Sequence, residues 1–147
     1  MRSIRIFALA SLSALVLAGS AAADSPNSGK KLETDLTGGA ERPGPGDPDG
    51  SGRATVNPQP SKNRVCYTLE VEDIETAAAA HIHLGGPDVA GPIVVHLAAP
   101  SSGQSSGCVE NLSEELVRSI KKNPEEYYVN VHNATFPRGA VRGQLDK

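Results

Sequence analysis

The sequence has no tryptophan and few other aromatic residues, with three tyrosines and two phenylalanines in 147 residues. It also has no excess of basic residues, because its 14 lysines and arginines are outnumbered by 17 aspartates and glutamates. A nucleic-acid-binding domain would carry a basic stripe with aromatic side chains that stack on bases. Since both features are missing, we expect no nucleic acid among the partners of this protein.

Long apolar runs are missing too, except near the N-terminus. Residues 6–19 are apolar, follow the basic Arg2 and Arg5, and precede three alanines at positions 21–23. This order predicts a signal peptide of residues 1–23, cleaved near Ala23, whose apolar segment is too short to span a membrane. The remaining 124 residues contain no transmembrane segment, so we expect a secreted or periplasmic protein.

Cysteine is scarce, and the two present are Cys66 and Cys108. Exported proteins fold in oxidising compartments, and an even number of cysteines leaves no thiol over. The alternative, two unpaired thiols, rarely persists in such compartments. We therefore predict one disulfide, which would close a loop of roughly 40 residues and stabilise the fold by about 3–4 kcal/mol.

Glycine and proline are abundant, at 15 and 11 residues, and predict many turns between short elements. Residues 24–31 are expected to be a flexible lead-in to a single domain of residues 32–147. Apolar and polar residues alternate within residues 64–73, 77–84, 93–98 and 126–131, as is typical of strands. These strands predict an aliphatic core that includes Val65, Leu69, Val71, Ile82, Leu84, Ile93, Val95, Leu97, Val129 and Val131.

Between the strands, the sequence predicts loops and one short helix. Residues 38–52 are dense in glycine and proline, and residues 101–107 form a polar linker. Asn111 can cap a helix that ends before Pro124 and carries Leu112, Leu116 and Ile120 at helical spacing. The fold class is therefore all-β, an antiparallel immunoglobulin-like or Greek-key sandwich or barrel with one short helix.

The four histidines form the most informative pattern. His81, His83, His96 and His132 each lie in a predicted strand or at its end, on the face opposite the aliphatic residues. His81 and His83 are two residues apart, so they project from the same side of one strand. Neutral imidazoles are good ligands for copper and zinc. We predict a metal site at His81, His83 and His132, with His96 as a fourth ligand or a neighbouring group.

Other interpretations of these residues stay open. A histidine on a strand is often a surface or hydrogen-bonded side chain, and His-x-His pairs also arise by chance. The serines at 101–106 lie in a polar stretch without the strained turn of a nucleophilic serine, so no catalytic triad is evident. The sequence thus favours a non-catalytic module over an enzyme.

The chain resembles the CHRD domain family in five stretches that follow one another in the family's order. They are residues 65–69 (VCYTL), 80–85 (AHIHLG), 91–95 (GPIVV), 127–132 (YYVNVH) and 136–145 (FPRGAVRGQL). The resemblance extends over roughly residues 32–145. It implies an immunoglobulin-like or related β-sandwich, and it does not imply one settled activity.

A weaker similarity, of geometry only, is to Cu/Zn superoxide dismutase, which also carries copper on a His-x-His strand outside a β-barrel. The main functional prediction is an extracytoplasmic binding module for a protein or polysaccharide, with a possible copper or zinc site. In that site Asn130 and Arg142 could orient the ligands. The alternative is a copper redox enzyme of the dismutase type.

Overall fold

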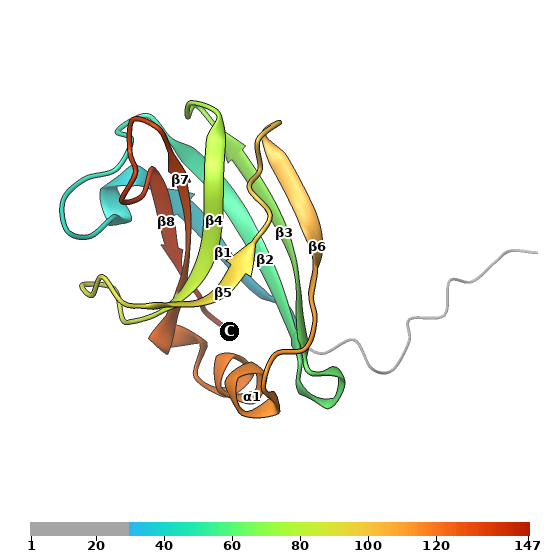
Figure 1. Ribbon diagram of the computed structural model, residues 1–147. Coiled ribbons are helices and arrows are strands. Elements are labelled where there is room, and N and C mark those ends of the chain that lie inside the picture. Colours follow the sequence, from blue (N-terminus) through green and yellow to red (C-terminus); the bar gives the residue numbers. More distant parts are fainter. Residues whose placement is uncertain (1–29) are drawn as a thin grey trace, which may run out of the picture.

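A computed structural model describes residues 30–147 of the protein, so the predicted signal peptide and most of the lead-in lie outside the described residues. Within this range, eight antiparallel strands form one sheet that curls into a nearly closed barrel (Figure 1). The strands are β1 (Leu32–Thr37), β2 (Ser51–Gln59), β3 (Arg64–Glu72), β4 (Ala77–Leu84), β5 (Ile93–Leu97), β6 (Gln104–Val109), β7 (Tyr127–Asn133) and β8 (Val141–Gln144). The all-β prediction is confirmed, in its barrel form.

The strands are not arranged in chain order. The order across the sheet is β5-β4-β7-β8-β1-β2-β3-β6, which leaves β5 and β6 as the two edges. Side chains link these edges, because the backbone N–H of Ala98 donates to the Tyr67 hydroxyl over 2.8 Å. In return, the Ser105 hydroxyl donates to the Ala98 carbonyl, also over 2.8 Å. The barrel is therefore closed at this seam by side-chain bonds instead of a strand ladder.

Short helices fill the ends and connections of the barrel. The helix α1 (Glu114–Lys122) covers one end, where Val117 and Ile120 are buried (Figure 1). Single-turn 3-10 helices lie at Gly38–Ala40, Pro60–Lys62 and Pro124–Glu126. No helix in residues 30–147 is long and apolar enough to cross a membrane.

The core is largely aliphatic, with Tyr67 and Tyr127 as its aromatic members, and two of the predicted core residues lie outside it. Leu84 and Ile93 were expected to face inward, but they are 41% and 42% exposed. Leu84 is the last residue of β4. For Ile93, the reason is a β-bulge between β4 and β5, where Ile82 pairs with Val95 but His83 pairs with Ile93. The extra residue moves Ile93 to the outer face beside His83, because directly paired residues share a face.

Two local predictions were wrong. Residues 104–107 of the predicted linker belong to strand β6, which has no apolar alternation and is held by its pairing with β3. The helix cap is Ser113, whose hydroxyl accepts from the Leu116 N–H over 3.2 Å, and not Asn111.

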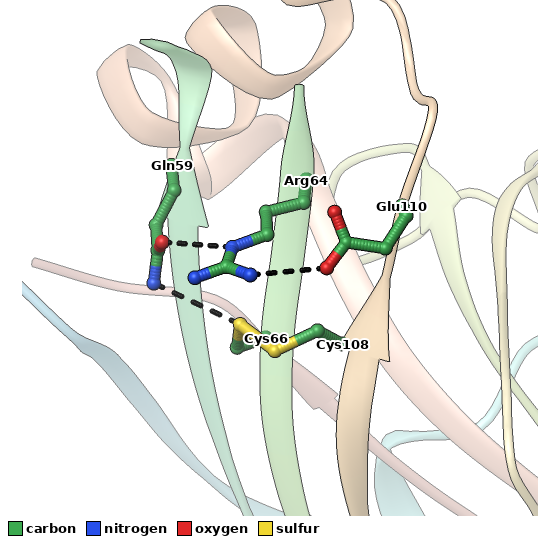
Figure 2. Close-up of a disulfide and its surroundings, with 5 residues drawn as sticks. All are labelled: Gln59, Arg64, Cys66, Cys108 and Glu110. Atoms are coloured by element: carbon green, nitrogen blue, oxygen red, sulfur yellow. Dashed lines mark hydrogen bonds and ion pairs between the residues drawn. A yellow bond between two sulfur atoms is a disulfide. The ribbon is translucent and has the colours of Figure 1, made fainter. Parts of the chain in front are cut away.

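The predicted disulfide is present. Cys66 and Cys108 are directly paired across β3 and β6 and are bonded to each other. Beside the disulfide, the Arg64 guanidinium donates to the side chains of Gln59 and Glu110 over 2.9 and 3.0 Å (Figure 2). A disulfide of this kind fits the oxidising conditions of an exported protein.

Candidate metal centre

Three of the four histidines converge on the outer face of β4 and β7. In the ladder between these strands, His81 is opposite Asn130, and His132 is opposite Ala79. This register brings Nδ1 of His81 to 3.1 Å from Nε2 of His132. Each of His81, His83 and His132 offers one ring nitrogen, and these three atoms lie within 4.8 Å of one another.

Backbone carbonyls set the orientation of two of these rings. Nδ1 of His83 lies 2.8 Å from the Gly91 carbonyl oxygen, and Nδ1 of His132 lies 3.2 Å from that of Pro137. A carbonyl oxygen only accepts, so in each ring Nδ1 is the donor and Nε2 keeps its lone pair. Metal-binding histidines are commonly held in this way, with the second nitrogen bonded to a carbonyl.

The cluster also favours uncharged imidazoles. Burial lowers the pKa of His81 to about 4, and the neighbouring imidazoles lower it further in the same direction. Burial likewise lowers the pKa of His83 and His132, although their bonds to backbone carbonyls act in the opposite sense. Only the neutral ring can bind a metal ion, so the lowered pKa of each ring favours the form that binds metal.

The spacing of the nitrogens suits one small ion. Two ligands on a tetrahedral zinc ion, with Zn–N bonds of about 2.0–2.1 Å, are about 3.3 Å apart. The separation of 3.1 Å between His81 and His132 is close to this value. His83 Nε2 is buried without a hydrogen-bond partner, so it is free to bind an ion.

His96 lies beside the three-histidine cluster but is not part of it. It pairs with His81 across β4 and β5, and the ring centroids are 5.0 Å apart. Its side chain is exposed, on the edge strand of the sheet. The structure therefore places His96 next to the cluster, in the position expected of a neighbouring group.

A stack of three side chains supports the cluster from one side. The guanidinium carbon of Arg142 lies 3.4 Å from the centre of the Tyr128 ring, and this ring stacks on His83 with centroids 4.7 Å apart. Arg142 is 1% exposed and donates to the carbonyls of Val89 and Gly86 over 2.9 and 2.8 Å. Arg142 therefore fixes both the loop above the stack and, through Tyr128, the plane of His83.

Glu41 is the part of the site that the sequence did not predict. It lies in the glycine- and proline-rich loop after β1, is 3% exposed, and accepts from Asn130 Nδ2. Burial raises its pKa to about 7, although Asn130 and Arg142 act to lower it. Gly139, with φ of 142°, leaves the space for this carboxyl, because a Cβ there would overlap it. A single acidic residue in a loop without periodicity carried no signal of burial.

Comparison with known proteins identifies one family. The family model of the CHRD domain matches residues 32–145, which spans all eight strands and every residue of the cluster. No curated protein and no solved structure matches the chain significantly. The match covers most of the sequence, and the chain therefore belongs to the CHRD domain family.

Proposed function

We propose that the protein is an exported, non-catalytic binding module that holds one zinc or copper ion through His81, His83 and His132. The observation that carries the proposal is the convergence of three neutral imidazoles, two of which have their other nitrogen bonded to a carbonyl. Imidazole nitrogens suit both metals. Membership of the CHRD family supports an extracellular interaction role for the domain.

Titration of the metal-free protein with Zn²⁺ and Cu²⁺ in a calorimeter tests this proposal. We expect one equivalent of metal to bind the wild type, and none to bind with comparable affinity when His81 and His83 are both replaced by alanine. His96→Ala is the matched control, since His96 lies outside the cluster. A wild type that binds neither metal, or a double variant that binds as the wild type does, would contradict the proposal.

A protein partner is the second candidate function, and one surface favours it. Among the described residues, the large apolar side chains that are exposed are Leu84, Val89 and Ile93, at 41%, 51% and 42%. Val89 lies in the connection between β4 and β5, and Leu84 and Ile93 are the strand residues on either side of that connection. Capture of a defined extracytoplasmic protein that persists with a chelator present, and is lost on Val89→Ser, would favour this candidate over metal-dependent binding.

A further inference from the structure

Two buried atoms near the cluster lack hydrogen-bond partners. They are Nε2 of His83 and Oδ1 of Asn130, in residues that are 8% and 2% exposed. The other such atoms among the described side chains are Oδ1 of Asn57 and Nδ2 of Asn133. A buried polar atom without a partner costs roughly 1–3 kcal/mol, so such atoms are rare in native proteins. Their presence in one place requires a physical reason.

The orientation of the Asn130 amide follows from Glu41. Nδ2 of Asn130 lies 3.3 and 3.5 Å from the two carboxyl oxygens of Glu41. Above about pH 7, where Glu41 is ionised, its carboxylate only accepts hydrogen bonds, so the amide presents its N–H₂ group to Glu41 and its oxygen to the opposite side. This geometry fixes Oδ1 as an acceptor that does not point toward Glu41.

The opposite side is the histidine cluster. Asn130 is paired with His81 across β4 and β7, on the same face of the sheet. Its amide is also close enough to His83 to act on the pKa of that ring. Nδ1 of His83 donates to the Gly91 carbonyl, so Nε2 of His83 carries a lone pair. Nε2 of His83 is therefore a hydrogen-bond acceptor, as Oδ1 of Asn130 is. Two acceptors cannot bond to each other, whereas a cation between them satisfies both.

We propose that Asn130 Oδ1 is the fourth ligand of the metal site, beside the three imidazoles. This inference rests on the proposed function, which supplies the three nitrogen ligands. Three imidazoles and one neutral oxygen form a tetrahedral donor set that suits Zn²⁺. The set contains no sulfur ligand of the kind that Cu(I) prefers. With the fourth position filled by the protein, the site resembles structural zinc sites, which are closed, more than catalytic ones, which keep a water.

Glu41 is then a positioning residue for Asn130. The carboxyl holds the amide so that the oxygen faces the ion, and Gly139 leaves the space in which it lies. His96 is the rival for the fourth position, but its side chain is exposed, and it does not join the cluster of three. The two candidates differ in donor atom, so a spectroscopic measurement separates them.

Cobalt(II) substitution and zinc competition test the assignment. The probes are Co²⁺ and Zn²⁺ added to the metal-free protein, with the visible absorption of Co²⁺ reporting ligand number and geometry. We expect Asn130→Leu, which keeps the shape but removes the oxygen, to weaken Zn²⁺ binding at least about tenfold and to change the Co²⁺ spectrum. His96→Ala should leave both the affinity and the spectrum unchanged.

A second variant tests the same assignment if Asn130→Leu does not fold. In the double variant Glu41→Gln with Asn130→Asp, the amide and carboxylate exchange places, and an oxygen still faces the ion. We expect it to bind Zn²⁺ at least as tightly as the wild type, with a four-coordinate Co²⁺ spectrum. Circular dichroism of each metal-free variant verifies that the fold persists.

The outcomes separate this inference from the proposed function. A wild type that binds neither Zn²⁺ nor Co²⁺ overturns both. A wild type that binds, together with a folded Asn130→Leu that has the same affinity and spectrum, overturns the fourth ligand alone. Loss of binding in His96→Ala would assign the fourth position to His96 and would also overturn it.

Discussion

Two outer faces of the same sheet carry polar side chains, but they have opposite environments. On β1 and β2, Arg53 lies 3.1 Å from Asp35, and the two side chains are 59% and 75% exposed. On β7 and β8, Asn130 and Arg142 pair across the strands, but they are only 2% and 1% exposed. Loops after β1, after β4 and after β7 cover the second face. Alternation along a strand identifies the outward side chains, but the covering loops decide whether those side chains meet water.

Removal of the buried arginine should have the largest effect. Arg142→Met deletes the donors to Val89 and Gly86 and leaves Glu41 without its nearby positive charge. We expect a loss of about 3–5 kcal/mol in the free energy of unfolding, measured with urea. The matched control is Arg53→Met on the exposed face, which should change it by less than about 0.5 kcal/mol. Equal effects of the two substitutions would mean that the two faces do not differ in this way.

The disulfide is expected to be the exception on the exposed face. Cys66→Ser with Cys108→Ser removes a bond between residues 42 positions apart. We expect a loss of about 3–4 kcal/mol, because the unfolded chain gains conformational freedom. Wild-type protein unfolded with a reductant present should show a similar loss, and the double variant should not respond to the reductant. A reductant effect on the double variant would contradict this explanation.

The charge of Glu41 should make the covered face sensitive to pH. Its pKa rises from 4.5 to about 7 on folding, so the folded state holds the proton more tightly than the unfolded state. The contribution of Glu41 to the stability of the metal-free protein should therefore fall as the pH rises from about 4.5 to about 7 and stay level above that, while the lowered pKa values of His81, His83 and His132 act in the opposite direction. The total is on the order of 3 kcal/mol.

Glu41→Gln tests this dependence, since its amide has no charge to lose. The difference in unfolding free energy between the variant and the wild type should shift in favour of the variant between pH 5 and pH 8. Asp35→Asn, on the exposed face, serves as the control and should show no comparable shift. Parallel pH profiles for Glu41→Gln and the wild type would argue against a neutral carboxyl in the folded protein.

The smallest expected effect concerns a single hydroxyl. The Tyr128 hydroxyl accepts from the Gly91 N–H over 3.0 Å, while the ring makes the stack with Arg142 and His83. Tyr128→Phe keeps the stack and should cost about 1 kcal/mol. Thr68→Val on the exposed face of β3 should cost less, as measured in the same urea series. A larger loss for Thr68→Val would reverse the comparison.

Much of the fold was predictable because one face of each strand is buried in the core. Strand β3 has strict alternation, and its structure matches the prediction from Arg64 to Glu72. Strand β6 has no apolar face, so its pairing with β3 is visible only in three dimensions. The bulge that exposes Ile93 was unpredictable for a related reason, since it depends on the pairing of two strands.

The candidate site was predictable to the extent that it lies on regular strands. His81, His83 and His132 come together because spacing by two on β4 and the register with β7 place them on one face. Glu41 comes from a loop, where no periodicity relates the sequence to burial. Asn130 was expected only as an orienting group, because its unpartnered oxygen depends on that loop residue.

The disulfide also affects how separate copies of the protein meet. Strand β6 forms a backbone ladder with β3 only and has no charged residue in its sequence, and its contact with the other edge of the sheet depends on side-chain bonds such as that of Ser105. If it separated, the backbone of β3 would be open to a strand from another molecule, which is a common route to aggregation. The bond between Cys66 and Cys108 keeps β6 in register even when its hydrogen bonds open. It therefore limits strand exchange between molecules.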